Sequence, residues 1–293
     1  MGAFCRLTAI RRVTNQLDHG VDRHTLVDWV AVSPPAIVAT DLDGTLIRSD
    51  GSVSERTRRA LRRVRERGGT VVFVTGRPIR VMADVVAQTS VAGIAVCANG
   101  ALVYDLDAEV MIGQRALDQA AAIRLANAIR EIVPEAAFAV ESGLQFGREP
   151  LFRTMWPDPG ELVADVAELL RTLPPAKLLV RRGGDSLADV YEKIVAMAGA
   201  EAVVTRSTET LIEIAGAGVS KAVALAEVAA ERGVTAADVV AFGDMLNDLP
   251  MLTWAGHSVA VANAHPQVLA VADEITASND QDGVALVLER LFP

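Results

Sequence analysis

The sequence predicts an α/β fold: a Rossmann-like, doubly wound parallel-sheet core with an α/β cap domain inserted in its middle. Three observations lead to this prediction. Short apolar segments alternate with helical patterns at both ends of the chain, which is typical of a parallel sheet covered on both faces. This rhythm changes near residue 104 and returns near residue 207. The 293 residues suffice for two modest domains at roughly 150 residues each.

The first part of the chain predicts three strands joined by two helices. Residues 36–40 (AIVAT) form an apolar, partly β-branched run that leads into DLDGTL, a pattern typical of a buried strand followed by a glycine turn. Ser54 is placed to cap a helix that we expect to end near Arg67. The next expected elements are strand 70–74, helix 80–88 and strand 93–97.

The middle of the chain predicts a separate α/β unit, after which the first rhythm returns. Its longest element is an alanine-rich helix over residues 117–132. The other expected elements of this unit are strand 138–140, helix 161–170, strand 177–181, helix 187–198 and strand 202–205. The last part predicts helix 219–232, strand 239–242, short helix 248–252, strand 259–261 and terminal helix 284–291.

These elements divide the chain into an arm, a discontinuous core and an inserted cap. We expect the core at residues 36–103 and 207–293, and the cap at residues 104–206. Residues 1–35 carry charges throughout and contain no uninterrupted apolar stretch. The sequence therefore predicts a flexible N-terminal arm rather than a secretory signal.

The composition argues against several classes of protein. Asp and Glu (37) outnumber Lys and Arg (28), and the formal net charge of −9 argues against nucleic-acid binding. The arginine-rich helix after Ser54 surrounds an ordinary apolar stripe with its charges, so we expect a solvated face there. Two cysteines without a CxxC spacing argue against a disulfide scaffold, and no apolar run reaches the roughly 18 residues of a membrane span. We therefore expect a cytoplasmic protein with no nucleic-acid or membrane partner.

Polar residues follow the predicted core strands at the point where each strand ends. Because ligands bind at the carboxyl ends of the strands in open α/β sheets, we expect these side chains to form one site. The residues are Asp41 and Asp43 after the first strand, Thr75 and Gly76 after the second, Asn99 after the third, Lys221 at the start of a helix, and Asp244, Asn247 and Asp248 after strand 239–242.

This set of side chains suits magnesium-assisted phosphoryl transfer. Mg²⁺ takes oxygen ligands and usually only one or two carboxylates, which Asp41 and Asp244 could supply. A carboxylate such as that of Asp41 can also attack phosphorus and form an aspartyl phosphate. Lys221 and Thr75 could hold the phosphoryl oxygens. Asp43 could protonate the leaving oxygen and then take a proton from the attacking water.

Five segments of the chain together resemble a known family. They are DLDGTL (41–46), VTGR (74–77), NGA (99–101), GVSKAVAL (218–225) and AFGDMLNDLPML (241–252). In this order they resemble the haloacid-dehalogenase-like phosphatases, and in particular the Cof-like branch (subfamily IIB), whose α/β cap selects the substrate. Ala222 and Ala262 stand where this family often has glycine, and neither change removes a functional group.

The resemblance implies the catalytic and metal-binding roles. Asp41 would be the nucleophile and a Mg²⁺ ligand, and Asp244 would complete the metal site. Asp43 would be the general acid and base, and its backbone carbonyl would also contact the metal. Asp248 would act indirectly, from behind the residues that contact the ion.

The resemblance also implies which residues bind the substrate. Thr75, Gly76 and Lys221 would hold the phosphate, and Asn247 would contact phosphate or substrate. Arg77 would either contact the substrate or form a structural ion pair. The cap matches the family only in outline, so its candidates for specificity contacts rest on residue type alone. They are Arg148, Arg153, Trp156, Lys177 and Arg181.

These expectations combine into a functional prediction with three alternatives. We predict a Mg²⁺-dependent phosphatase, monomeric or homodimeric, that acts on a small phosphorylated metabolite such as a sugar phosphate or a phosphorylated cofactor. A phosphomutase of the same superfamily shares the aspartyl-phosphate step. A receiver-type signalling domain requires neither Asp43 nor a cap. A non-catalytic metabolite sensor could lose any of four residues at little cost, yet all are present: Asp41, Asp43, Lys221 and Asp244.

Overall fold

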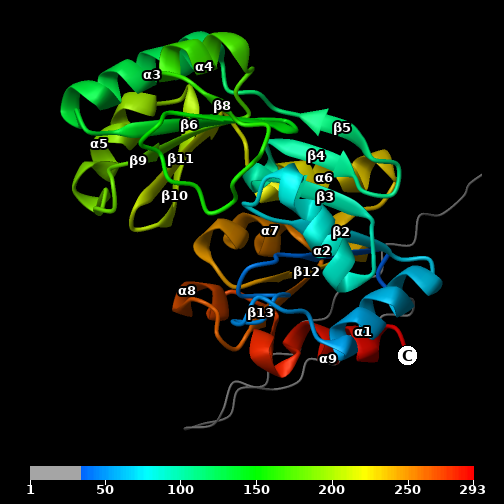
Figure 1. Cartoon of the computed structure of the whole chain (residues 1–293). Coiled ribbons are helices and arrows are strands. Elements are labelled where there is room, and N and C mark those ends of the chain that lie inside the picture. The colour runs from blue at the N-terminus through cyan, green and yellow to red at the C-terminus, as the bar shows by residue number, and fades with distance from the viewer. Residues whose placement is uncertain (1–33) are drawn as a thin grey trace, which may run out of the picture.

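The protein has two lobes, each built on its own β-sheet. A computed structural model describes residues 34–293, so the predicted arm lies outside the described residues except for its last two positions. Figure 1 shows the core lobe at lower right and the cap lobe at upper left. The core sheet has the strand order β14-β13-β12-β1-β2-β3-β4-β5, and the cap sheet has the order β10-β11-β9-β6-β7-β8. The predicted α/β fold class is confirmed.

The core sheet is parallel from β14 to β3, and an antiparallel hairpin extends its edge. The central strand β1 is completely buried because helices cover both of its faces, which explains why its sequence is apolar without alternation. The parallel strands are β1 (Ile37–Thr40), β2 (Thr70–Val74), β3 (Ile94–Cys97), β12 (Val239–Gly243), β13 (His257–Val261) and β14 (Glu274–Thr276). The hairpin consists of β4 (Leu102–Asp105) and β5 (Val110–Gln114).

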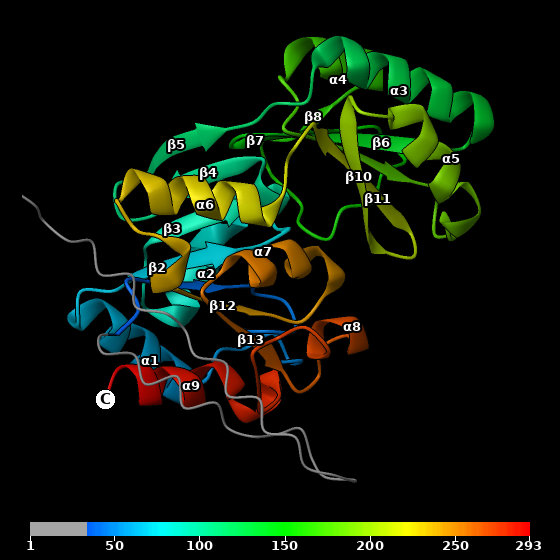
Figure 2. The ribbon, with the colours of Figure 1, turned by 180° about the vertical axis from the view of Figure 1, so that it is seen from behind.

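Helices lie on both faces of the core sheet. Helices α1 (Glu55–Glu66), α2 (Met82–Thr89) and α9 (Gly283–Leu291) share one face, and α6 (Lys221–Glu231) and α7 (Leu249–Trp254) share the other, as Figures 1 and 2 show. The short α8 (Pro266–Leu269) packs near β13. Helix α1 begins where the Ser54 side chain accepts the Thr57 N–H. No helix within residues 34–293 combines the length and the apolar character that crossing a bilayer requires.

The cap sheet is covered by helices on one face only. Helices α3 (Gln119–Ile132), α4 (Val166–Thr172) and α5 (Ala188–Ala198) pack on its outer face, while the inner face is turned toward the core lobe (Figure 1). A smaller apolar cluster on the inner face includes Ala139, Phe152 and Leu179. The strands are β6 (Ala137–Ser142), β7 (Gln145–Arg148), β8 (Leu162–Val163), β9 (Lys177–Arg181), β10 (Ala202–Thr208) and β11 (Leu211–Gly216).

The chain passes between the two sheets at positions that differ from the expected boundaries at 103/104 and 206/207. Strands β4 and β5 pair with β3 and so belong to the core sheet, while β11 forms a hairpin with β10 and belongs to the cap sheet. In a tight hairpin each strand pairs with the strand just before it, and therefore joins the same sheet. The order of helical and apolar segments in the sequence does not show this pairing, so the expected boundaries differ from the observed ones. The helix expected over 161–170 is the strand β8 followed by α4, whose first N–H groups are capped by Asp165.

Candidate active site

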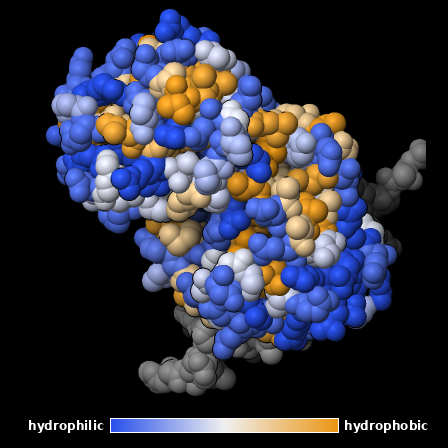
Figure 3. All heavy atoms as spheres, viewed as in Figure 1, coloured by the Kyte–Doolittle hydropathy of each residue, from blue (hydrophilic) through white to orange (hydrophobic). Residues whose placement is uncertain are grey.

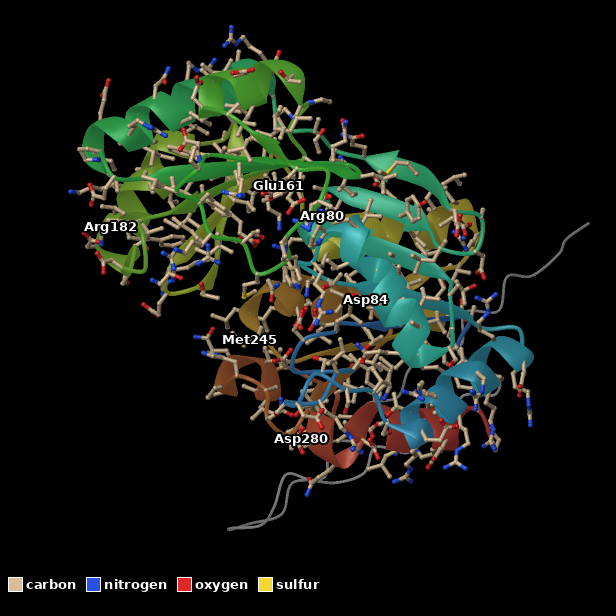
Figure 4. The ribbon with its side chains drawn as sticks, in the orientation of Figure 1. Arg80, Asp84, Glu161, Arg182, Met245 and Asp280 are labelled. Carbon is tan, nitrogen blue, oxygen red and sulfur yellow. The ribbon has the colours of Figure 1, made fainter. Side chains whose placement is uncertain are left out.

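The candidate active site lies where the chain order of the core sheet reverses. After β1 the chain continues to β2 on one side, whereas β12 pairs with β1 on the other side. This reversal opens a crevice at the carboxyl ends of β1 and β12, which is where ligands bind in open α/β sheets. Asp41 follows β1 and Asp244 follows β12. Met245, the residue after Asp244, marks this end of the sheet at the junction of the two lobes in Figure 4.

A buried lysine joins two of the carboxylates. The Lys221 Nζ donates to Asp41 Oδ1 and to Asp248 Oδ1, at 2.6 Å in each case. The Lys221 side chain is only 1% exposed, and it starts α6, whose N-cap is Ser220. The start of α6 sits close against Gly100, where a Cβ atom would lie 2.2 Å from the Ser220 carbonyl oxygen. The glycine of the NGA motif therefore lets the lysine-bearing helix approach the sheet.

Asp248 orders the site from behind. Its Oδ1 accepts from Lys221, and its Oδ2 accepts the backbone N–H groups of Asp244 and Met245, at 3.1 and 2.9 Å. A Cβ atom on Gly243 would lie 2.7 Å from the Asp248 Cβ, so this loop requires glycine for close packing. Both carboxylate oxygens of Asp248 thus accept hydrogen bonds from the protein itself. Asp248 therefore positions Lys221 and the backbone of Asp244 and Met245.

The loop after β1 fixes the orientation of Asp244. The Thr45 hydroxyl donates to Asp244 Oδ1 at 2.8 Å. Gly44 has a φ of +82°, and a Cβ atom there would lie only 2.5 Å from Asp244 Oδ2. Glycine is therefore required at this position both for its backbone conformation and for the space that the carboxylate occupies.

The buried charges do not balance. Asp41, Asp244 and Asp248 offer oxygens that lie within 4.8 Å of one another, and within residues 34–293 the one ammonium bonded to them is that of Lys221. Burial raises the pKa of Asp41 well above its ordinary value, and Asp248 and Asp244 add to this against the opposing charge of Lys221. Burial is also the main reason that the pKa of Asp244 rises to about 6.

The lysine itself remains charged. Burial alone would lower the pKa of Lys221, but the adjacent Asp248 and Asp41 outweigh it and raise the pKa above its ordinary value. Three carboxylates then face one positive charge, a donor set that fits a hard divalent cation. Asp41 and Asp244 are the two residues suited to hold it, since neither Oδ2 accepts a hydrogen bond from the described residues, whereas Asp248 is fully engaged.

Asp43 lies apart from this cluster and forms an ion pair with Arg77. The Arg77 Nε and Nη2 donate to the two Asp43 oxygens at 2.9 and 2.6 Å, and the Asp43 side chain is 60% exposed. Of the two alternatives for Arg77, this structure contains the ion pair. A contribution of Asp43 to a metal site would therefore have to come from its backbone carbonyl, as the resemblance implies.

Hydrogen bonds join the loops after β2 and β3. Thr75 is fully buried; its hydroxyl accepts the Arg77 N–H at 3.1 Å, and its carbonyl accepts the Asn99 N–H at 3.0 Å. The exposed Asn247 donates from Nδ2 to Asn99 Oδ1 at 3.3 Å. A Cβ atom on Gly76 would lie 3.2 Å from that same Asn99 oxygen. The structure thus brings Thr75, Gly76, Asn99 and Asn247 together at one rim of the site.

A cleft of about 430 Å³, part of it open to solvent, lies between this rim and the inner face of the cap sheet. The surface is indented between the two lobes in Figure 3. Three of the expected specificity residues, Lys177, Arg181 and Trp156, line the cleft, whereas Arg148 and Arg153 do not. The other lining residues are Gly76, Pro78 and Ala98 from the core, and Glu141, Phe152, Thr154, Met155, Leu179, Leu211 and Glu213 from the cap.

A buried polar chain connects the cleft to the core. Asn99 Nδ2 donates to Glu213 Oε2 at 2.9 Å, and Lys177 Nζ donates to Glu213 Oε1 at 3.0 Å and to the Gly76 carbonyl at 3.3 Å. The sequence interpretation missed Glu213 and Glu141. Each is a charged residue inside an apolar strand (LIEIAG and AFAVES), and that interruption was the available signal.

Comparison with known proteins gives a consistent result. The family model for haloacid dehalogenase-like hydrolases matches residues 38–288. The chain is 29% identical over 269 residues to the 5-amino-6-(5-phospho-D-ribitylamino)uracil phosphatase YitU of Bacillus subtilis, covering 88% of this chain and 98% of that protein. It is 28% identical over 242 residues to the HMP-PP phosphatase of Cronobacter sakazakii, covering 79% and 86%. A solved haloacid dehalogenase-like hydrolase from Bacteroides thetaiotaomicron superimposes with a TM-score of 0.75 at 27% identity, covering 88% of this chain and 99% of that chain.

Proposed function

Since the chain belongs to the haloacid dehalogenase-like hydrolase family and is a phosphatase of it, we propose that it hydrolyses a small phosphate monoester through an aspartyl phosphate on Asp41. The observation that carries this proposal is the buried contact between Lys221 and Asp41, with Asp244 beside them. A buried pair of a carboxylate and an ammonium contributes little to stability relative to well-packed apolar side chains. Stability alone therefore does not explain this pair at a strand end. The pair does suit a nucleophile that must be held in one orientation.

The first half of the reaction transfers the phosphoryl group to the protein. An oxygen of Asp41 forms a bond to phosphorus while the bond from phosphorus to the leaving oxygen breaks. Asp43 gives a proton to that oxygen, for which its ion pair with Arg77, in which both Asp43 oxygens accept, has to open and Asp43 has to be protonated. Lys221 orients Asp41 and faces the phosphoryl oxygens, and Thr75 and Gly76 lie at the rim where those oxygens would be held.

The second half returns the protein to its starting state. Asp43 takes a proton from a water molecule, the water oxygen bonds to phosphorus, and the bond from phosphorus to Asp41 breaks. Inorganic phosphate leaves. Mg²⁺, held by Asp41 and Asp244, would neutralise charge on the phosphoryl group during both halves. The excess of buried negative charge at these residues is what supports a divalent ion in this place.

The substrate class follows from the relatives and the cleft. The two curated relatives are named as phosphatases of 5-amino-6-(5-phospho-D-ribitylamino)uracil and of HMP-PP, which are small phosphorylated compounds. The cleft is lined by residues of both lobes and includes the Gly76 loop at the rim of the site, so a molecule bound there would contact core and cap together. We propose a phosphorylated metabolite of this size as the substrate of this chain.

Phosphate release from a panel of phosphorylated metabolites tests this function. With Mg²⁺ and without a bisphosphate activator, the wild-type protein should release phosphate, and EDTA should abolish the release. Asp41→Asn should lower kcat by about four orders of magnitude or more, because the amide cannot act as the nucleophile. Equal activity of Asp41→Asn and wild type would contradict the mechanism, and dependence on a bisphosphate activator would favour a phosphomutase.

A further inference from the structure

One buried carboxylate in the cleft is only half satisfied. Glu141 lies on β6, directly across from Lys177 on β9, and is 5% exposed. Its Oε1 accepts from Arg80 Nη2 at 2.8 Å, whereas its Oε2 accepts no hydrogen bond from the described residues. Arg80 comes from the core, in the turn Ile79–Val81, and reaches the cap at the junction of the lobes (Figure 4). The mechanism uses neither residue.

The other buried carboxylate of the cleft differs from Glu141 in this respect. Both oxygens of Glu213 receive hydrogen bonds, one from Lys177 and one from Asn99. Glu213 is therefore part of the polar chain that ties cap to core. Glu141 lines the cleft, and its buried Oε2 is left without a donor from the described residues. The residue lies close to the Gly76 loop because its neighbour Lys177 bonds to the Gly76 carbonyl.

The surroundings make an unpaired acceptor costly. The cleft wall contains the apolar side chains of Phe152, Leu179 and Leu211 beside the charged Lys177, Arg181 and Glu213. Burying a polar group without a hydrogen-bond partner costs free energy, and burying a charged group costs more. A hydrogen bond to the group offsets this cost. Burial raises the pKa of Glu141 to about 7, although Arg80 and Lys177 oppose this. A donor on a bound molecule would supply the missing partner.

We propose that Glu141 is a specificity-determining residue, and that its Oε2 accepts a hydrogen bond from a hydroxyl or amino group on the leaving group of the substrate. The site would then select phosphate monoesters that carry such a donor near the ester and an apolar or ring portion that packs on Phe152 and Leu179. This inference rests on the proposed phosphatase function and adds the chemistry of the leaving group to it.

Glu141→Gln is the informative variant because Arg80 fixes its orientation. Arg80 requires an oxygen opposite Nη2, so the amide nitrogen must take the place of Oε2 and present a donor where the carboxylate presented an acceptor. Glu161→Gln is the matched control. Glu161 is also a cap carboxylate paired with an arginine, Arg148 at 2.6 Å, and also has an unpaired Oε2, but it does not line the cleft.

The experiment compares two kinds of phosphate monoester in all three proteins. The donor-bearing ester is whichever of ribitol 5-phosphate, glucose 6-phosphate and phosphoethanolamine the wild type hydrolyses best, and 4-nitrophenyl phosphate is the ester whose leaving group has no donor. Glu141→Gln should lower the ratio of kcat/KM between them by about 10- to 100-fold, the effect of one hydrogen bond to a charged group. Glu161→Gln should leave the ratio within about twofold of wild type.

Other outcomes overturn the inference. An unchanged ratio in Glu141→Gln means that the carboxylate does not contact the leaving group. A uniform loss on both esters means that Glu141 has a structural role, and a melting temperature below that of Glu161→Gln would accompany it. Failure of the wild type to hydrolyse even 4-nitrophenyl phosphate would instead contradict the proposed phosphatase function itself.

Discussion

The catalytic cluster of the core and the cleft of the cap handle buried charge in different ways. In the core, Lys221 joins Asp41 to Asp248, and glycines at 44, 100 and 243 let the backbone close around them. The core oxygens without a donor among residues 34–293, Oδ2 of Asp41 and of Asp244, are those suited to a cation. In the cap, Glu141 Oε2 accepts no hydrogen bond from the described residues, in a cleft wall that contains both apolar and charged side chains. The difference indicates a division of labour. The core is organised before the substrate arrives, whereas the cap is completed by the substrate.

Removal of the central lysine should produce the largest effect on stability. Lys221→Met leaves Asp41 and Asp248 as buried carboxylates without their ammonium, which should reduce the free energy of unfolding by about 3 to 5 kcal/mol. Lys177→Met should cost less, because Lys177 bonds to one carboxylate and to a backbone carbonyl. Urea unfolding in EDTA measures both.

The exposed Lys193→Met serves as the control for that comparison and should change stability by no more than about 0.5 kcal/mol. If Lys177→Met proves as costly as Lys221→Met, the cap is as tightly organised as the core, and the proposed division of labour is wrong.

A smaller effect is expected from a single methyl group beside Asp244, the proposed metal ligand. In Gly44→Ala the new Cβ atom would displace Asp244 Oδ2, so the Mg²⁺ concentration for half-maximal activity should rise by about 10- to 100-fold. Gly51→Ala is the matched control, since Gly51 has nearly the same φ of +81° but nothing within 4 Å of its Cβ position. Similar shifts in both variants would attribute the effect to backbone strain and not to Asp244.

The pH dependence of stability tests the half-satisfied state of Glu141. Its pKa is about 7 in the folded protein against an ordinary value of 4.5. Between pH 4.5 and pH 7, Glu141 is protonated in the folded protein and ionised in the unfolded chain. The contribution of Glu141 to the free energy of unfolding is therefore present at low pH and is lost as the pH rises through 7. The difference in unfolding free energy between wild type and Glu141→Gln should fall by about 3 kcal/mol from pH 4.5 to 8, at about 1.4 kcal/mol for each unit of the pKa shift.

Urea unfolding at several pH values measures that difference, and active-site carboxylates cancel from it because both proteins contain them. A difference that stays constant with pH would show that the carboxylate is well solvated or fully paired, and would remove the physical reason for expecting a donor on the substrate.

Much of the core site could be predicted because its residues follow strands. Asp41 and Asp244 follow strands that are far apart in the chain, yet the rule that parallel strands end at one edge of the sheet places them together. The same rule anticipates Thr75 and Asn99, whereas Lys221 starts a helix and follows no core strand. The rule does not give the orientation of a side chain, so the ion pair between Arg77 and Asp43 stayed one of two alternatives until the structure showed it.

The cap resisted prediction for a different reason. Along β6, β9 and β11, the side chains of the inner face alternate with side chains that are buried under the cap helices. The sequence of one strand shows neither which strand pairs with it nor in which register. The expected candidates were chosen by residue type, which found Lys177, Arg181 and Trp156 but also Arg148, which binds Glu161 instead.

The sequence by itself determined the α/β class, the inserted cap and the chemical character of the core site, because local patterns and strand-end motifs carry that information. Only the tertiary structure decided which strands belong to which sheet, that Asp248 is fully occupied by the protein, and that Arg80 of the core meets Glu141 of the cap. Those features depend on contacts between residues far apart in the chain. Such contacts are set by side-chain packing, which no local pattern encodes.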